Sequence, residues 1–393
     1  MLFERQIFTK LREEIETKEI TVITGMRRVG KTTAIRYLYD LVGSKNKVFL
    51  DLENPINRKV FEEENYDSVW SNLKQFGITD SQKAYIFLDE AQNLPELSRV
   101  AKYLYDHFDI KFVLTGSSSY YLRNLFPESL AGRKIVFELY PLNFAEFLVF
   151  KNVSRIEKNT LKEKAAGKNK ISYASLEPYY QEYLEFGGFP SAVLEENPDR
   201  KRALLSEIFT SYFEKDAKNL ADFKDMSKLR DLILLLVPRV ASRIEIQKLA
   251  SELSMSRETV YNYLSFLEQT YFISLLPRYS ASIDRQAAGS KKLFFCDMGI
   301  VNVLGKASKG QIFEQSVFQN LRGFYDIAYF SKDGTSEIDF ILDKKFALEA
   351  KLSFSPRDMR SLMQRSAGLD IAERYIVSNH FTDRSDAILA VDL

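Results

Sequence analysis

The stretch ITVITGMRRVGKTT, residues 20–33, decides the fold of the N-terminal part of this chain. An apolar run at 20–24 leads into Gly25, Gly30 and Lys31, which with Thr32 complete the spacing GxxxxGK[ST]. This spacing between a strand and a helix is typical of a loop whose backbone N–H groups surround phosphates. The glycines let the backbone curl, and the N-terminus of the following helix adds positive potential. The stretch therefore predicts a nucleotide-binding P-loop.

The polar side chains of this loop have expected roles in binding ATP and Mg²⁺. Lys31 is expected to reach the β- and γ-phosphates, and the Thr32 hydroxyl is expected to ligate Mg²⁺. The residues predicted to bind the cofactor are Gly25, Arg28, Gly30, Lys31, Thr32, Thr33 and Asp89.

A second acidic stretch, YIFLDE at 85–90, supplies the other side of the same site. An apolar strand that ends in Asp-Glu places Asp89 beside the metal and Glu90 beside the attacking water. Glu90 is therefore the candidate general base. Alone, such a pair is more often a helix cap or a solvated element, but its position after a P-loop favours the catalytic interpretation.

Two further residues are candidates for the chemistry of phosphoryl transfer. Ser117, in the run TGSSS, is a candidate sensor of the γ-phosphate, although a serine-rich turn that caps a helix is an alternative. Arg133 is a candidate for stabilising transition-state charge from a neighbouring subunit, which predicts a homo-oligomer. The alternative for Arg133 is an ordinary surface arginine.

The organisation of the chain predicts several domains, because 393 residues exceed what one core comfortably holds. Apolar strands alternate with helical segments from 19 to 150, which predicts a parallel sheet covered on both faces. Expected strands are 20–24, 48–52, 85–88, 111–115 and 134–139. The predicted domains are 1–150, a basic insertion with a helical lid at 151–226, 227–297 and 298–393.

Charge and cysteine content restrict the function classes. Lys+Arg (55) and Asp+Glu (54) nearly cancel, so binding to nucleic acid must rest on local basic patches. The single cysteine, Cys296, lies in an apolar run, which indicates a core cysteine and a reducing compartment. The first residues interleave charged and apolar side chains, unlike a secretion signal, and no apolar run is long enough to span a bilayer. We expect a cytoplasmic protein without a membrane partner.

Residues 151–172 carry seven Lys/Arg against two Glu and almost no large apolar side chains. A solvated surface insertion is the favoured interpretation, and a DNA-binding arm is the alternative.

Residues 246–296 have the pattern of a winged helix: helix, tight turn, helix and then two paired strands. Residues 227–292 carry ten Lys/Arg against six Asp/Glu, so this region is locally basic. A packing module without DNA is the alternative. Expected DNA contacts are Arg257, Thr259, Asn262, Lys291 and Lys292.

A set of charged residues near the C-terminus has the spacing of a metal-dependent nuclease site. Asp339 lies on one expected strand, and Glu349 and Lys351 lie two residues apart on the next, so they share a face. Asp339 and Glu349 are expected to hold Mg²⁺ or Mn²⁺, with Glu314 as a further ligand and Lys351 placing the water. Such spacing also occurs by chance in a chain of which 28% is charged.

Taken together, these motifs resemble a family of bacterial and archaeal AAA+ ATPases. The matching text is GMRRVGKTT, LDEAQ, TGSSS, SLAGR, YPLNFAEF, FGGFP, GQIFEQSV, SEIDFIL and LEAKLS. The resemblance implies an α/β fold: a P-loop AAA+ parallel sheet with a helical lid, a winged helix and a C-terminal α/β domain similar to PD-(D/E)XK nucleases. It also implies ATPase activity.

The leading hypothesis is an ATP-hydrolysing AAA+ protein that binds DNA and cleaves it with its C-terminal domain. The alternative is a nucleotide-dependent switch that binds DNA or a protein and whose nuclease-like domain is a non-catalytic platform. A small-molecule kinase is disfavoured, because the Asp89–Glu90 pair suits water as the nucleophile.

Overall fold

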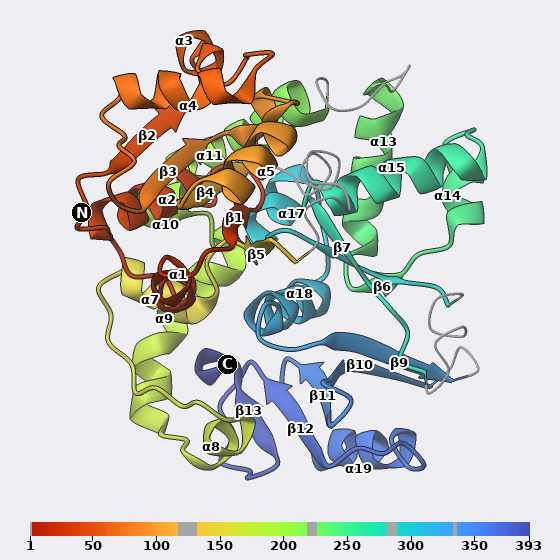
Figure 1. The fold of residues 1–393 in the computed structure, drawn as a ribbon. Helices are drawn as coiled ribbons and strands as arrows, with labels where there is room; N and C mark the ends of the chain where they lie inside the picture. The colour runs from red at the N-terminus through yellow and green to blue at the C-terminus, as the bar shows by residue number, and fades with distance from the viewer. Residues whose placement is uncertain (1, 117–131, 218–225, 281–288, 333–335) are drawn as a thin grey trace. The chain divides into compact units, whose positions relative to one another are not determined.

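The computed structural model describes residues 2–116, 132–217, 226–280, 289–332 and 336–393 (Figure 1). These residues form two units. The N-terminal unit comprises Met1–Tyr140 with Gln269–Tyr271, and the C-terminal unit comprises Pro141–Glu268 with Phe272–Leu393. The finer division of the C-terminal unit into three domains stays a prediction.

The N-terminal unit is built on a five-stranded parallel sheet in the order β2-β3-β4-β1-β5. The strands are β1 (Ile20–Thr24), β2 (Lys47–Asp51), β3 (Ala84–Asp89), β4 (Ile110–Gly116) and β5 (Lys134–Glu138). Every residue of β1, β3 and β4 is buried, which is why these strands are continuous apolar runs without alternation. The predicted parallel sheet is confirmed.

The helices of this unit connect the strands and cover the sheet. They are α1 (Ile7–Glu14), α2 (Lys31–Leu41), α3 (Pro55–Lys59), α4 (Tyr66–Gln75), the short helix η1 (Ala91–Asn93) and α5 (Leu97–His107). The buried side of α4 and α5 joins the sheet residues in one apolar core that includes Trp70, Leu73, Val100 and Leu104.

The C-terminal unit begins with a helical region. Its helices are α7 (Phe144–Phe150), α8 (Leu161–Ala166), α9 (Lys170–Phe186), α10 (Pro190–Leu194), α11 (Pro198–Ser211) and η3 (Tyr212–Ala217). No helix among the described residues is both long and apolar enough to cross a membrane.

A second region of this unit combines three helices with a small antiparallel sheet in the order β6-β8-β7. The elements are α13 (Met226–Leu236), η4 (Val237–Arg239), β6 (Ser242–Arg243), α14 (Ile246–Glu252), α15 (Arg257–Gln269), β7 (Ile273–Leu276) and β8 (Lys292–Phe295). Val260, Leu264 and Leu267 form the buried stripe of α15 that their spacing predicts. Cys296 is a buried free thiol, as expected of a core cysteine.

The chain ends in a mixed sheet of order β13-β12-β11-β10-β9. Its strands are β9 (Ile327–Lys332), β10 (Ser336–Leu342), β11 (Phe346–Lys351), β12 (Glu373–Ser378) and β13 (Ala387–Leu389). The helices of this region are α17 (Met298–Leu304), α18 (Lys309–Leu321), α19 (Pro356–Arg365) and the short η5 (Ala390–Asp392). Strands β9, β10 and β11 are antiparallel, whereas β11, β12 and β13 are parallel. Figure 1 shows α18 and α19 on opposite sides of this sheet.

The basic insertion is mostly exposed, as its composition predicts, but several of its cations have partners within the fold. Four of its cations contact the last residues of the chain: Arg155 donates to the Val391 carbonyl (3.2 Å), Lys158 pairs with Asp392 (2.9 Å), Lys164 donates to Leu393, and Lys168 donates to the Ala387 carbonyl (2.8 Å). The composition of the segment did not reveal these partners, because they lie more than 200 residues after the insertion in the sequence.

A fully buried carboxylate, Asp297, joins the helical region to α17 and α18. It accepts hydrogen bonds from the Gly188 N–H (2.6 Å), the Gly299 N–H (2.8 Å) and the Gln319 amide (2.9 Å). Burial raises the pKa of Asp297, and these donors oppose that shift. Gly188 also approaches the Leu142 backbone so closely that an added Cβ would lie 2.1 Å from the Leu142 carbonyl oxygen. This contact explains the motif FGGFP.

We expect Gly188→Ala to destabilise the C-terminal unit by about 1–3 kcal/mol, because its Cβ has no room without a backbone shift. Gly43→Ala is the matched control, since an added Cβ there meets nothing within 4 Å. The measurement is the thermal unfolding midpoint of both variants. Equal midpoints would show that the close approach is not a constraint.

Candidate functional site

The P-loop adopts the curled backbone that its sequence predicts. Gly25 has φ +146°, and a Cβ there would lie 2.1 Å from the Leu139 carbonyl oxygen. Arg28 and Gly30 also have positive φ values, of 65° and 104°, and Gly30 is the N-cap of α2. No other residue type fits at Gly25, so the loop and the following helix begin where the motif places them.

The Lys31 side chain lies inside the curl of the loop. Lys31 is only 5% exposed, and its ammonium group donates to the carbonyls of Gly25 (2.9 Å) and Met26 (3.0 Å). Thr32 and Thr33 are exposed at the first turn of α2. The loop therefore presents a lysine ammonium and two hydroxyl groups at the N-terminus of one helix, the chemistry that nucleotide phosphates and Mg²⁺ require.

The acidic side of the site is fixed by Thr115 at the end of β4. Its hydroxyl group donates to Asp89 and accepts from the Glu90 backbone N–H (3.0 Å). Burial raises the pKa of Asp89, while hydrogen bonds from Thr115 and Thr32 oppose the rise. A divalent cation would favour the ionised form of this carboxylate, so Thr32 and Asp89 fit a Mg²⁺ ion between them.

Glu90 is held in a left-handed backbone conformation, with φ 55°. Its carboxylate accepts a hydrogen bond from the Gln92 amide two residues later. The side chain is half-buried, in contrast with the buried Asp89. This arrangement separates the two carboxylates that the sequence assigns to different roles.

Arg5, which precedes α1, contacts the backbone of the P-loop. Arg5 is 6% exposed and donates to the Val29 carbonyl (3.0 Å) and to the Tyr140 carbonyl (2.9 Å). It thereby connects the residue preceding Gly30 to the segment that follows β5. This role could not be predicted from the sequence, because a single arginine far upstream of a motif forms no recognisable pattern.

The two other residues predicted for catalysis at this site are Ser117 and Arg133. Ser117 lies outside the described residues. Arg133 precedes β5, where its backbone carbonyl accepts from the Ile20 N–H, and its side chain pairs with Asp106 (3.2 Å). Because β1 and β5 run parallel, Arg133 lies at the end of the sheet opposite to the P-loop of its own chain. A role across a subunit boundary stays a proposal.

The C-terminal charged residues do converge. Asp339 lies on β10, which pairs antiparallel with β11, and its carboxylate accepts from the Ala350 N–H of β11 (3.0 Å). Glu349 pairs with Lys351 (2.9 Å) and with Arg365 of α19 (2.5 Å). We call Glu314, Glu337, Asp339 and Glu349 the carboxylate centre.

Lys292 enters this centre from β8. Its Nζ atom lies 2.6 Å from Glu314 Oε1, 2.6 Å from Glu337 Oε1 and 3.4 Å from Asp339 Oδ1. The contact with Glu314 is an ion pair whose angles are not those of a hydrogen bond. Only 1% of the Lys292 side chain is exposed. The expectation that Lys292 contacts DNA is therefore wrong, because its ammonium group is buried among carboxylates.

Burial governs the titration of the carboxylate centre. Burial, together with the nearby Asp339 charge, raises the pKa of Glu314 to about 8 and that of Glu349 to about 7, while Lys292 and Lys351 oppose the respective shifts. Burial lowers the pKa of Lys292, but the charges of Asp339, Glu314 and Glu337 outweigh it and hold the pKa above its usual value. Within the described part of the chain, no group of three or more His, Cys, Asp or Glu side chains is arranged to hold a metal ion.

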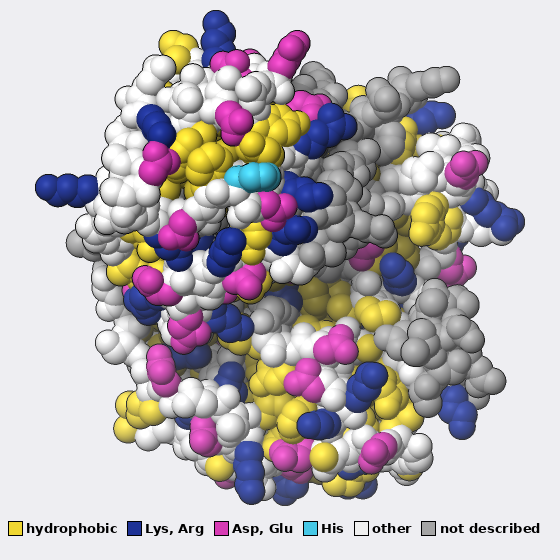
Figure 2. All heavy atoms as spheres, viewed as in Figure 1, with side chains coloured by type: hydrophobic (Ala, Val, Ile, Leu, Met, Phe, Trp, Pro, Cys, Tyr) yellow, Lys and Arg dark blue, Asp and Glu magenta, His cyan; other side chains and the backbone are white. Residues whose placement is uncertain are grey.

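The other predicted DNA contacts lie at the surface. Arg257 and Asn262 are exposed on α15, and Thr259 bonds to the Ser256 hydroxyl group (2.8 Å) at the start of the helix. Lys291 is 43% exposed in its side chain and lies 3.8 Å from Glu268. On the face drawn in Figure 2, basic and acidic side chains alternate without a broad basic patch.

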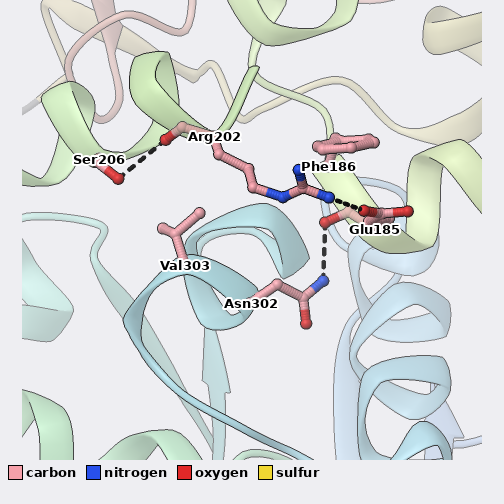
Figure 3. Close-up of a pocket in the computed structure, with 6 residues that line it drawn as sticks. All are labelled: Glu185, Phe186, Arg202, Ser206, Asn302 and Val303. Atoms are coloured by element: carbon pink, nitrogen blue, oxygen red, sulfur yellow. Dashed lines mark hydrogen bonds and ion pairs between the residues drawn. The ribbon is translucent and has the colours of Figure 1, made fainter. Parts of the chain in front are cut away.

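A separate pocket of about 440 Å³ lies in the C-terminal unit, between α11 and α17 (Figure 3). Arg202 crosses it, pairs with Glu185 (2.7 Å) and lies over the Phe186 ring (5.4 Å). Asn302 donates to the Glu185 carbonyl (2.8 Å), and Ser206 donates to the Arg202 carbonyl (2.9 Å). These polar groups bond to one another, so we assign the pocket a structural role.

Comparison with known proteins supports the assignment of the N-terminal unit. Residues 17–148 match the model of an AAA domain, and residues 177–311 match a domain of unknown function (DUF8612). The uncharacterized protein MJ1544 of Methanocaldococcus jannaschii is 30% identical over 350 residues, which cover 84% of this chain and 75% of that protein. The chain belongs to the family of that archaeal protein. Its N-terminal unit is a P-loop AAA ATPase domain.

Bacterial proteins are also similar in sequence to this chain. An uncharacterized protein of Haemophilus influenzae is 28% identical over 343 residues, 84% of this chain and 80% of its own length. Among solved structures, the Walker-type ATPase PABY2304 of Pyrococcus abyssi aligns with a TM-score of 0.47 at 15% identity, over 77% of this chain and 96% of that chain.

We expect Thr115→Val to lower the turnover of ATP by this AAA protein roughly tenfold or more, because Asp89 and the Glu90 backbone both lose their shared partner. Nucleotide affinity should change much less, since the phosphate-binding loop is untouched. Thr115→Ser keeps the hydroxyl group and is the control. Steady-state hydrolysis and nucleotide titration of the two variants measure the effects, and equal turnover would remove Thr115 from the site.

Proposed function

We propose that this protein hydrolyses ATP at the P-loop and uses the nucleotide cycle to control DNA binding by its C-terminal unit. The observation that carries the first part is the convergence of Lys31, Thr32 and Asp89, with Thr115 fixing both Asp89 and Glu90. A P-loop lysine, a metal-binding hydroxyl and an adjacent acidic pair together suit transfer of a phosphoryl group to water.

In the proposed mechanism, Lys31 binds the β- and γ-phosphates. Thr32 and Asp89 would hold Mg²⁺, which would supply positive charge next to the phosphates. Glu90 orients a water molecule and accepts its proton. The Gln92 amide, which donates to Glu90, positions this carboxylate. Arg5 keeps the backbone of the loop in the conformation that accepts phosphates.

Lys31→Ala is expected to abolish tight ATP binding, because the charge that neutralises the phosphates is lost. Glu90→Gln should keep the binding and lose hydrolysis, because only the base is removed. Fluorescent-nucleotide titration and phosphate release distinguish the two variants. Equal loss of binding in both variants would remove Glu90 from the role of base.

Support for DNA binding comes from the region between α13 and β8. The order helix, strand, helix, helix, strand, strand, with a small antiparallel sheet, supports the proposal of a winged helix. Arg257 and Asn262 are exposed on the second helix of the pair, the usual recognition helix. Without the buried Lys292, residues 227–291 carry nine basic and six acidic residues, which favours a modest electrostatic attraction to phosphates.

The double variant Arg257→Ala, Lys291→Ala should weaken DNA binding and flatten its dependence on salt, because fewer counterions are released. Arg200→Ala is the control, since this exposed arginine of α11 pairs with Glu195 outside the helix pair. Fluorescence anisotropy with duplex, junction and single-stranded DNA at several salt concentrations gives both quantities. If the wild type binds none of these DNA forms, the region is a packing module.

The second candidate function is metal-dependent DNA cleavage by the C-terminal sheet. It is favoured by the hydrogen bond between the Asp339 carboxylate and the Ala350 N–H of β11, and by Lys351 beside Glu349 on that strand. The surrounding framework, helix–strand–strand–strand–helix–strand, is similar to that of PD-(D/E)XK nucleases. Cleavage of DNA in Mn²⁺ that is lost in chelator and in Asp339→Ala would establish this activity. Intact DNA under all conditions would favour the alternative, a nuclease-like platform without catalysis.

A further inference from the structure

The carboxylate centre already contains a cation. The Lys292 ammonium group contacts carboxylate oxygens of Glu314 in α18 and of Glu337 and Asp339 in β10. Glu314 and Glu337 are more than 20 residues apart in the sequence. We propose that Lys292 determines whether this centre binds a divalent metal: its ammonium group is the resident cation, and a metal binds only when that group is removed. This inference rests on the proposed nuclease-like domain, because it concerns the same carboxylates.

Lys292 and a metal would need the same oxygens. Glu314 and Asp339, two of the three residues predicted to hold Mg²⁺ or Mn²⁺, lie 2.6 and 3.4 Å from the Lys292 Nζ atom. The third, Glu349, has both carboxylate oxygens in ion pairs, with Lys351 and Arg365. A metal ion at this position would therefore have to displace side-chain cations from every predicted ligand.

The charges of the centre are balanced without a metal. Its four carboxylates face four cations: Lys292, Lys351, Arg365 and Arg243, which lies 3.5 Å from Glu337. A divalent ion is attracted to a site with excess negative charge, and this set has none. Removal of the Lys292 charge would leave Glu314, Glu337 and Asp339 without their shared partner, and buried carboxylates without a partner gain strongly from a cation.

The backbone of Lys292 is fixed from both sides. Strand β8 pairs with β6 and β7, where Lys292 lies opposite Arg243 and Leu276. Two residues later, Phe294 stacks on Phe318 of α18 with ring centroids 4.3 Å apart. The Phe295 N–H and carbonyl both bond to the Gln315 side chain, at 2.8 and 2.9 Å. These contacts hold β8 against α18, so the ammonium group stays in the centre while the strand is in place.

The test is Mn²⁺ binding to the full chain without nucleotide. Thr32→Ala serves as the background because it removes the P-loop metal ligand. In this background, the wild-type centre should show no Mn²⁺ site that depends on Asp339. Lys292→Met, an apolar side chain of similar length, should gain one Mn²⁺ site, and this site should be lost again when Asp339→Asn is added. Lys291→Met, the neighbouring lysine at the surface, should gain none.

Isothermal titration and Mn²⁺ electron paramagnetic resonance give the number of sites and their affinity, and circular dichroism checks the fold. Lys292→Gln, which keeps a donor without a charge, replaces Lys292→Met if that variant does not fold. An Asp339-dependent Mn²⁺ site in the parent, or no new site in a folded Lys292 variant, would overturn the proposal. Loss of the fold in both variants would also overturn it, by giving Lys292 a purely structural role.

The binding readout is separate from cleavage. If Lys292→Met gains a metal site and neither it nor the parent cuts DNA, the nuclease proposal fails while the role of Lys292 stands. If the parent cuts DNA in Mn²⁺, Lys292 is not the determinant, and the nuclease proposal stands.

Discussion

The packing of the C-terminal unit depends on two buried charged side chains, Lys292 and Asp297, which lie near opposite ends of β8. Just beyond one end, Asp297 accepts hydrogen bonds from Gly188, Gly299 and Gln319 and so joins the helical region to α17 and α18. At the other end, Lys292 pairs with carboxylates of α18 and β10. Neither charge is stable in the interior without these partners, so each requires the surrounding elements to pack around it. The helical region and both sheets of this unit are thereby tied to one short strand.

The parts predicted from sequence are those whose signal is local. The P-loop is defined by Gly25, Gly30 and Lys31 within one stretch, and the five strands of the parallel sheet are apolar runs found within one or two residues of their expected bounds. The roles of Thr115 and Lys292 depend on which strands are neighbours, which a single sequence does not specify. Lys292 follows another lysine and precedes an apolar run, so composition placed it at the surface, whereas pairing with Glu314 and Glu337 makes its burial possible.

The two charged sites differ in how they treat a cation. At the P-loop, the pKa of the buried Asp89 is raised, and its carboxylate accepts hydrogen bonds from the Thr115 and Thr32 hydroxyl groups. In the carboxylate centre, lysine and arginine side chains occupy the positions around the carboxylates. The sequence suggests a metal site at both groups of carboxylates. The structure supports a metal site beside the nucleotide, whereas the charges of the carboxylate centre are neutralised by lysine and arginine side chains of the same chain. This contrast favours an ATP-driven switch over a protein with two catalytic metals.

The most direct measurement is the anomalous scattering of Mn²⁺ in crystals of the wild-type protein grown with a non-hydrolysable ATP analogue. The account predicts one manganese peak, between Thr32, Asp89 and the phosphates, and none within reach of Glu314, Asp339 and Glu349. A manganese ion bound between Asp339 and Glu349, with Lys292 turned away, would contradict it. An analogue bound with no manganese beside Thr32 and Asp89 would contradict the assignment of the P-loop site.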